Sequence, residues 1–291
     1  MYFWQLVVSG LSIGSLYALV SLGIVLLYRT SRVLNFAHGD MSMITTMVAY
    51  SLLTAAGFAF GPAAVLTLAV AFAAGAAFYF LVLRPVKEAT LLGQIITTAG
   101  FSLVLSGLAV VVWSADTKVL PFPLSRAVVY NIAGLAVNQV ALGSFLVAVV
   151  SVLGLYLLVQ RTRFGLAMRA VSQNDVAARV LGIPVRRVFA VTWGVSATLG
   201  AIAGMLLAPV TLVSPSMMFD PFLKGFAGAV LGGLDSLPGA IVGSLVIGVV
   251  ENLFGGYVST SLRTTVAFVM IIAVLLVRPE GLFGHKFMRR V

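Results

Sequence analysis

Long apolar stretches separated by short polar breaks fill nearly the whole chain. About twenty consecutive apolar residues are enough to cross a bilayer as an α-helix, so each long stretch predicts a membrane-spanning helix. The pattern therefore predicts an all-α fold, a polytopic transmembrane helix bundle of eight to nine membrane segments with one short or re-entrant helix. The eight longer stretches are Leu6–Tyr28, Met41–Phe60, Pro62–Leu83, Ile95–Trp113, Val140–Val159, Val188–Ala208, Ile241–Phe254 with its flanks, and Thr264–Val277, and the short ninth is Phe222–Leu234.

The composition supports the membrane interpretation. The chain is 61% hydrophobic and only 9% charged, which disfavours the alternative of an unusually apolar soluble protein, because soluble domains leave much of their surface in water. The first stretch lacks a preceding basic region and is too long for a secretory signal. We therefore expect a retained first helix with Tyr2, Phe3 and Trp4 at a membrane interface. The absence of cysteine excludes disulfides and thiol chemistry.

The net charge of +10 raises the question of a nucleic-acid partner. The basic residues lie between the apolar stretches rather than in one patch, so membrane topology explains them better and we expect no nucleic acid to bind. With the N-terminus outside, 14 of the 18 basic residues face inward, which predicts a cytoplasmic C-terminus and an odd number of crossings, hence nine. Eight full helices plus a re-entrant piece is the alternative. The inward set is Arg29, Arg32, Arg84, Lys87, Arg161, Arg163, Arg169, Arg179, Arg186, Arg187, Arg278, Lys286, Arg289 and Arg290, and the outward set is Lys118, Arg126, Lys224 and Arg263.

Small residues recur at a spacing of four within the apolar stretches. This spacing lets helix backbones approach closely in lipid, although membrane helices also contain more glycine in general. The pairs are Gly10 with Gly14, Gly200 with Gly204, Gly228 with Gly232, Gly239 with Gly243, and Ser244 with Gly248.

A polar cluster precedes the second apolar stretch. Asn35, His38 and Asp40 at a helix entrance suggest an N-cap, a broken helix or the polar lining of a cavity, and a simple boundary cap is the plainer alternative. The only other histidine is His285 near the C-terminus, so we expect no metal site.

Three further charges lie in or beside apolar stretches, namely Lys224, Asp235 and Glu251. A charge inside a membrane is costly and is therefore a functional candidate. Glu251 is the strongest, since an apolar run leads directly into it. We predict that Asn35, His38, Asp40 and Glu251 line a substrate path; a purely structural pairing of Glu251 with Arg263 or Lys224 is the alternative.

The longest inward polar break spans residues 161–187. Its middle predicts a short helix over Ser172–Gly182, with Ser172 as a possible N-cap, Asp175 in the first turn, and Gly182 with Pro184 ending it. Such a helix on the cytoplasmic face suits a soluble partner, whereas a loop held to anionic lipid by its arginines is the alternative. The sequence carries no phosphate-binding loop, zinc-protease motif or nucleophile elbow, so the chain is not itself an ATPase.

Several strings along the chain resemble the permeases of branched-chain amino acid ABC transporters, the H-type subunit. They lie at residues 10–19, 35–40, 162–170, 224–233, 237–240 and 278–284, so the resemblance covers nearly the whole chain. It implies one transmembrane permease domain over residues 1–291 in a bacterial inner membrane, without a cofactor. It also implies four partners, which are a related second permease, two cytoplasmic ATPases and a periplasmic solute-binding protein.

The resemblance further implies that residues 161–187 contain the helix that couples to the ATPases. Importers of this kind carry an E-A-A-x-x-x-G pattern there, and this chain offers Ala177, Ala178 and Gly182, with Val176 in the Glu position and Asp175 one residue earlier. Asp235 stands where the family usually has a small residue. A substrate other than leucine, isoleucine or valine is then conceivable, since related permeases carry urea, amides or aromatic acids.

An autonomous ion-coupled secondary transporter of a small polar solute is the competing function. Such a protein would need several acidic residues inside its spans, and the sequence offers only Asp40, Asp235 and Glu251.

Overall fold

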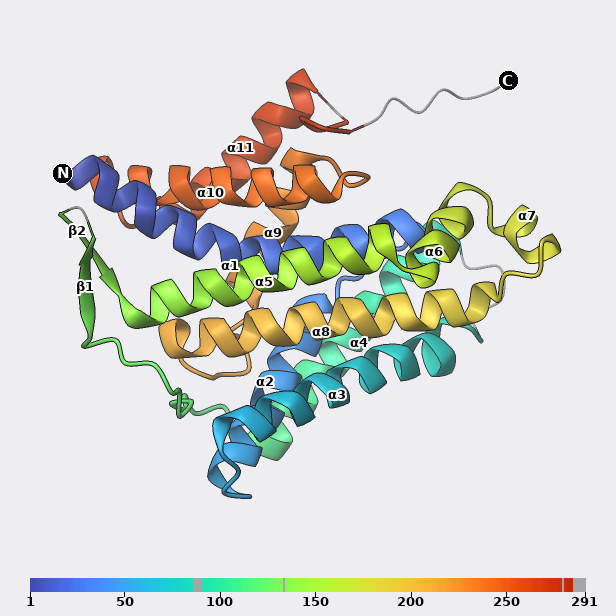
Figure 1. Cartoon of the computed structure of the whole chain (residues 1–291), viewed down its shortest axis with the longest axis horizontal. Coiled ribbons are helices and arrows are strands. Elements are labelled where there is room, and N and C mark those ends of the chain that lie inside the picture. Colours follow the sequence, from blue (N-terminus) through green and yellow to red (C-terminus); the bar gives the residue numbers. More distant parts are fainter. Residues whose placement is uncertain (86–89, 133, 279, 285–291) are drawn as a thin grey trace. The chain divides into compact units, whose positions relative to one another are not determined.

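The computed structural model describes residues 1–85, 90–132, 134–278 and 280–284. The predicted features at Lys87, His285, Lys286, Arg289 and Arg290 lie outside these residues. Within them, helices account for every apolar stretch predicted from the sequence (Figure 1). The long helices are α1 (Tyr2–Ser31), α3 (Phe60–Phe78) with its π-helical continuation η1 (Tyr79–Leu83), α4 (Leu91–Trp113), α5 (Gln139–Arg161), α8 (Val185–Thr211) and α10 (Leu237–Tyr257).

These long helices are the six in the described residues that are long and apolar enough to cross a membrane. Three further helices coincide with predicted stretches but are shorter, with 17, 14 and 15 residues. The prediction of a helical membrane bundle is therefore confirmed, while the length criterion by itself supports six segments rather than eight or nine. The shorter helices are α2 (His38–Thr54), α9 (Phe219–Gly232) and α11 (Arg263–Val277).

A small β-hairpin occupies part of the polar break before α5. Strands β1 (Val129–Ile132) and β2 (Leu135–Asn138) pair antiparallel, with Val129 opposite Asn138. Gly134 has φ +81°, the left-handed conformation that a tight turn requires and that glycine adopts without steric cost. The sequence pattern did not predict these strands, because each has only four residues and the described side chains of β1 are exposed on both faces.

The chain divides into two compact units, and helices α1 and α5 contribute to both. Unit 1 comprises residues 1–25, 124–148 and 220–291, and unit 2 comprises residues 26–123 and 149–219. The core of unit 1 joins α1, α9, α10 and α11, and that of unit 2 joins α1, α2, α3, α4 and α8. In unit 1 the core residues are Tyr17, Ala227, Leu231, Ile247 and Ala267, and in unit 2 they include Leu27, Met41, Phe78, Trp193 and Ala197.

Glycines bring the helix backbones together, as the small-residue spacing predicts. In unit 1, a Cβ at Gly10 would lie 2.6 Å from Cα of Val249, and a Cβ at Gly248 would lie 2.5 Å from Cα of Gly14. In unit 2, a Cβ at Gly204 would lie 3.0 Å from the carbonyl oxygen of Ser42. These separations are below van der Waals contact, so α1 and α10, and likewise α2 and α8, pack at a distance that only glycine allows.

Within unit 2, aromatic and polar contacts show which helix ends lie together. Trp113 Nε1 donates to Ser51 Oγ at 2.7 Å, which joins the C-terminal ends of α4 and α2. Lys118 and Val213 form a β-bridge that joins the same end of α4 to the end of α8. At the opposite end, the rings of Tyr79 and Phe189 lie 5.8 Å apart, where η1 meets the start of α8. Helices α2, α4 and α8 therefore run parallel to one another, and α3 runs antiparallel to α8.

Residues 161–187 form two short helices rather than one. Helix α6 (Arg163–Gln173) extends through Ser172, and α7 (Asp175–Val180) follows it. The prediction of one helix over Ser172–Gly182, with Ser172 as a possible N-cap, is therefore wrong in its start: Asn174 caps α7, and its Oδ1 accepts from the backbone N–H of Ala177 at 2.9 Å. The sequence did not predict this break, because a single residue, Asn174 with its extended backbone, separates the two helices.

Candidate functional site

The polar entrance of α2 is organised by Asn35. Its Oδ1 accepts from the backbone N–H of Ala37 at 3.0 Å, one residue before the helix begins at His38. Ala37 occupies the N-cap position and has no side-chain acceptor, so neither His38 nor Asp40 caps the helix. Thr98 on α4 donates to the carbonyl oxygen of Leu34 at 3.3 Å and so attaches this entrance to the start of α4.

His38 is the first residue of α2, and its side chain points toward α8. The side chain is fully buried, and Nδ1 lies 3.4 Å from Ser196 Oγ on α8. A Cβ at Gly200 would lie only 3.2 Å from His38 Cε1, so the glycine leaves the room that the imidazole ring occupies. His38 therefore sits inside the helix interface of unit 2 rather than in an open channel.

Asp40 faces α4 from the first turn of α2. The hydroxyls of Ser102 and Ser106 donate to its two carboxylate oxygens, with 2.8 Å between Ser106 Oγ and Asp40 Oδ1. These serines are spaced by four residues, so both lie on one face of α4. Asp40 is half-buried, and it is the member of this cluster that keeps access to its surroundings.

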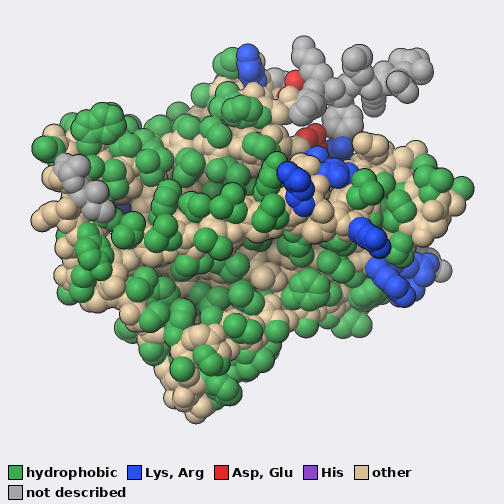
Figure 2. All heavy atoms as spheres, viewed as in Figure 1, with side chains coloured by type: hydrophobic (Ala, Val, Ile, Leu, Met, Phe, Trp, Pro, Cys, Tyr) green, Lys and Arg blue, Asp and Glu red, His purple; other side chains and the backbone are tan. Residues whose placement is uncertain are grey.

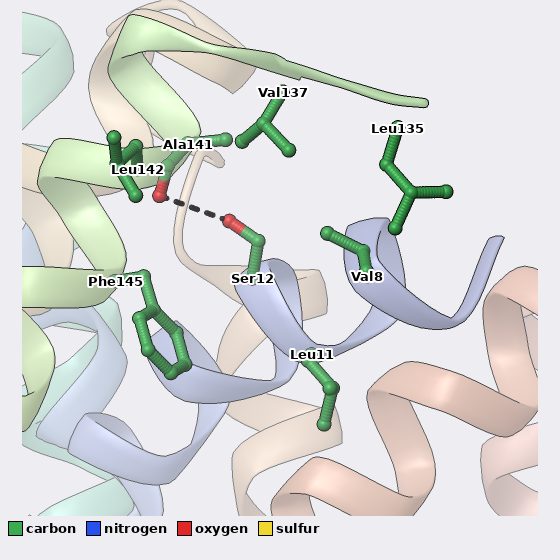
Figure 3. Close-up of a pocket in the computed structure, with 8 residues that line it drawn as sticks. All are labelled: Val8, Leu11, Ser12, Leu135, Val137, Ala141, Leu142 and Phe145. Carbon is green, nitrogen blue, oxygen red and sulfur yellow. Dashed lines mark hydrogen bonds between the residues drawn. The ribbon is translucent and has the colours of Figure 1, made fainter. Parts of the chain in front are cut away.

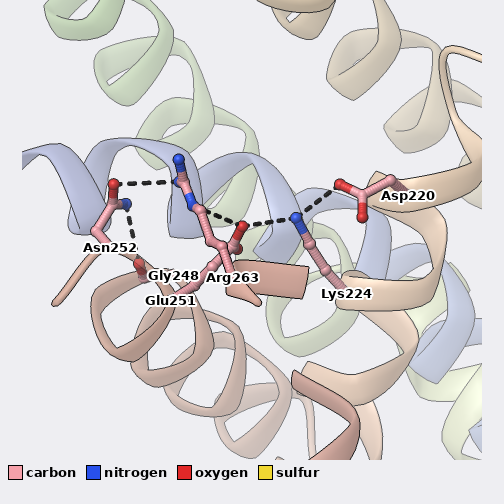
Figure 4. Close-up of polar contacts among 6 residues, drawn as sticks. All are labelled: Asp220, Lys224, Gly248, Glu251, Asn252 and Arg263. Atoms are coloured by element: carbon pink, nitrogen blue, oxygen red, sulfur yellow. Dashed lines mark hydrogen bonds and ion pairs between the residues drawn. The ribbon is translucent and has the colours of Figure 1, made fainter. Parts of the chain in front are cut away.

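Glu251 lies at the centre of a charge network in unit 1 (Figure 4). Its Oε1 is 2.6 Å from Lys224 Nζ of α9 and 2.9 Å from Arg263 Nε at the start of α11. Lys224 Nζ also lies 2.7 Å from Asp220 Oδ2, one turn earlier on α9. Arg263 Nη2 donates to Asn252 Oδ1 at 3.1 Å, which extends the network along α10.

The network is electrically balanced, because two carboxylates face two cations. Glu251 is 1% exposed and Lys224 is 5% exposed, so each would be very costly without its partner. The structure thus shows the pairing of Glu251 with both Lys224 and Arg263 that the sequence left as the structural alternative. Asn35, His38 and Asp40 belong to unit 2, whereas Glu251 belongs to unit 1.

Sequence reasoning did not single out Asp220 or Asn252 as members of this network. The four-residue spacing of Asp220 and Lys224 was a usable signal, since residues four apart lie on one helix face. Asn252 carried no such signal. Asp235, the third predicted charge, lies in the turn between α9 and α10.

Helix α7 is capped at both ends. Asn174 caps its start, and Asp175 lies in the first turn as predicted, 3.6 Å from Arg179. Its end is a Schellman motif, in which the N–H of Ile183 donates to the carbonyl of Ala178 and Gly182 adopts φ +83°. The predicted stop at Gly182 is confirmed.

The two faces of α7 differ. Ala178, which the sequence offers as part of the coupling pattern, is 2% exposed, because it packs inward where α7 meets α6 and α8. Ala177 and Gly182 are exposed. The outward face instead carries Val176 and Val180, which are 65% and 83% exposed.

The surface is largely apolar. On the face drawn in Figure 2, hydrophobic side chains spread over most of the area. Highly exposed apolar residues occur in the middle of long helices, among them Leu103 and Val104 of α4 and Leu153 of α5. Such helices suit a lipid surrounding, so the chain is a multi-pass membrane protein. Among the described residues, no three His, Cys, Asp or Glu side chains are grouped so that they could hold a metal ion.

Comparisons with known proteins agree with this arrangement. A family model described as "Branched-chain amino acid transport system / permease component" matches residues 6–275. The high-affinity branched-chain amino acid transport system permease protein LivH of Escherichia coli K12 is 31% identical, over 100% of this chain and 98% of LivH. The corresponding protein BraD of Pseudomonas aeruginosa is 30% identical over the same shares.

A solved structure shares the fold. PsaBC from Streptococcus pneumoniae, in complex with Fab, superimposes with a TM-score of 0.50 over 96% of this chain and 93% of that chain, at 15% identity. The family model matches residues 6–275, and LivH and BraD match the chain over its whole length. The chain therefore belongs to the family of permease components of branched-chain amino acid transport systems.

Proposed function

We propose that this chain forms half of the translocation path of an ABC importer for branched-chain or related amino acids, and that ATP hydrolysis takes place on separate subunits. Its membership of the permease family and its similarity to the branched-chain amino acid permeases LivH and BraD support the substrate class. Its partners are a related second permease, two cytoplasmic ATPases and a periplasmic solute-binding protein. The single permease domain spans residues 1–291, with the coupling loop at 161–187.

The proposed topology has nine crossings of a bacterial inner membrane, the N-terminus outside and the C-terminus in the cytoplasm. Six long helices and the shorter α2, α9 and α11 make up the nine segments. Within unit 2, Arg84 and Arg186 lie at one bundle end and Lys118 at the other, which supports the orientation.

A single cysteine at position 118 is expected to react with an impermeant thiol reagent from the periplasmic side. Labelling only from the cytoplasmic side would contradict the topology.

The observation that carries the coupling role is the exposed apolar face of α7. Val176 and Val180 are four residues apart and so project from the same side of the helix, and Leu181 follows at 80% exposure. A small apolar ridge on a short helix that is capped at both ends suits insertion into a groove of a soluble partner. Asp175, Ala177, Ala178 and Gly182 then act in different ways: Ala178 seats α7 on its own subunit, and the others shape the helix and its outer surface.

Val180→Glu tests this role in the complex with both ATPases, the second permease and the binding protein. Burial of an unpaired charge at the contact is expected to lower the ATPase stimulation by leucine-loaded binding protein about tenfold, and to weaken co-purification of the ATPases. The measurements are ATPase rate and subunit recovery.

Val119→Glu is the matched control, because Val119 is 72% exposed and lies beside Lys118 at the opposite end of unit 2. It introduces the same charge without touching α7, so co-purification of the ATPases is expected to stay at the wild-type level. Equal stimulation in wild type and Val180→Glu would show that α7 is not the coupling element. Ala178→Glu is a poorer test, since it would disturb the packing of α7 itself.

The substrate path is proposed to run along the polar entrance of α2 in unit 2. Asp40 is its accessible member, while Asn35 shapes the entrance and His38 holds α2 against α8. Glu251 contributes through the charge network of unit 1. The pairing of Asp40 with two serines and of Glu251 with two cations disfavours the ion-coupled alternative, in which these carboxylates would bind the coupling ion.

A further inference from the structure

Unit 1 contains an apolar pocket of about 250 Å³ near the N-terminal end of α1 (Figure 3). One wall comes from α1, one from strand β2 and one from the first turns of α5. The eight lining residues are Val8, Leu11, Ser12, Leu135, Val137, Ala141, Leu142 and Phe145.

The β2 wall is held in place by Gln5. Its side-chain Nε2 donates to the carbonyl of Ala136 at 2.6 Å, and the N–H of Ala136 donates back to Gln5 Oε1 at 3.0 Å. The amide of Gln5 therefore pairs with β2 as a neighbouring strand would. This pairing fixes Leu135 and Val137, on either side of Ala136, over the pocket.

The pocket walls suit an alkyl group and no polar ligand. Among the lining residues Ser12 carries the one polar side chain, and its hydroxyl donates to the carbonyl of Ala141 at 3.1 Å. A bound water needs two to four polar partners, which these walls do not supply. The charged ends of a free amino acid would be desolvated there without compensation.

The pocket opens to the surroundings of the protein, because every lining residue is only partly buried. Directly after Phe145 on α5, the apolar surface continues with Leu146 and Val147, which are 55% and 43% exposed. This is the kind of surface that lipid covers in a multi-pass membrane protein.

Its depth matches the acyl region of a bilayer. Tyr2 and Trp4 are 57% and 60% exposed at the start of α1, as aromatic residues are at a membrane interface. At a rise of about 1.5 Å per residue, Val8 and Ser12 lie roughly 6 and 12 Å farther along the helix than Trp4. The pocket thus lies just beyond the interface, where acyl chains begin.

We propose that this pocket binds one acyl chain of a membrane phospholipid. An apolar cavity of about 150 Å³ accommodates benzene, so this pocket has room for a segment on the order of ten carbon atoms. The lipid occupies the space between α1, β2 and α5 and supports the hairpin against the helices.

The test uses the full chain in nanodiscs of phosphatidylethanolamine and phosphatidylglycerol that contain a small fraction of phosphatidylcholine with a diazirine on one acyl chain. Crosslinked residues are mapped by mass spectrometry. The lining residues of α1 and α5 are expected to be labelled well above Leu103, a residue of α4 that is 76% exposed and reports ordinary lipid contact.

Ala141→Phe fills the pocket and is expected to lower its labelling about tenfold, since the loss of contact with only two methylenes has an effect of this size. Val8→Phe fills the same space from the opposite wall and replaces the first variant if that one does not fold. Leu146→Phe is the control and is expected to leave the labelling unchanged.

Three results would overturn the proposal. Labelling of the lining residues no stronger than that of Leu103 would leave only unspecific lipid contact. Displacement of the label by excess leucine would assign the pocket to the transported solute. Loss of the label on adding the second permease subunit would make the pocket a protein interface.

Discussion

The two units bury polar groups in different ways. In unit 2, the buried hydroxyls of Ser42, Thr45 and Thr46 on α2 donate to carbonyl oxygens of the preceding turn, at 2.7 to 3.0 Å. Unit 1 buries serines as well, such as Ser15, but it also buries the charges of Lys224 and Glu251, whose partners come from other helices or other turns.

This difference separates local from tertiary stabilisation. A hydroxyl that bonds to its own helix is satisfied wherever the helix forms, so these hydroxyls of α2 need no partner from another helix. A buried charge is tolerated only when its partners are in place, so the network requires α9, α10 and α11 to be assembled. Unit 1 is accordingly the unit in which a single polar substitution has the larger effect.

Glu251→Leu is expected to have the largest effect. It leaves Lys224 with Asp220 and Arg263 with Asn252, but removes the carboxylate that joins the two cations at the centre of the network. The loss is expected to be about 3 kcal/mol, the lower end of the range for breaking a buried ion pair. The free energy of unfolding in a fixed detergent measures it.

Thr45→Val is the matched control in unit 2, because Thr45 is 4% exposed and its hydroxyl bonds within α2. Its effect is expected to stay below about 1 kcal/mol, as for other hydroxyls in membrane helices. Combining Glu251→Leu with Lys224→Met should restore part of the lost stability, since the uncompensated charge is removed. A Glu251→Leu protein as stable as Thr45→Val would erase the contrast between the units.

Gly200→Val is expected to have an intermediate effect, of about 1–3 kcal/mol, through overpacking rather than lost polar bonds. Its new side chain would meet Ser42 and His38, so α2 and α8 would have to move apart. Gly107→Val on α4 is the control, since a Cβ there meets no atom within 4 Å. If both variants unfold at the same temperature, close α2–α8 packing is not what holds unit 2 together.

Much of the fold follows from local sequence patterns. Apolar length alone placed the helices, because in lipid a backbone must satisfy its hydrogen bonds within the segment. The small-residue spacing at Gly200 and Gly204 indicated where helices approach, since the spacing itself puts both residues on one face. The stop at Gly182 was readable for the same local reason, a left-handed turn that glycine favours.

The partners of these local elements were decided by tertiary structure. Glu251 meets Lys224, 27 positions away in the chain, and Asp40 meets Ser106, 66 positions away, and no periodicity encodes such pairings. Ala178 and Val180 lie on opposite sides of α7, and only the packing of α7 on its neighbours decides which side is covered. Likewise the apolar pocket exists because Gln5 pairs with β2, and long-range contacts of this kind depend on the assembled fold rather than on the pattern along the chain.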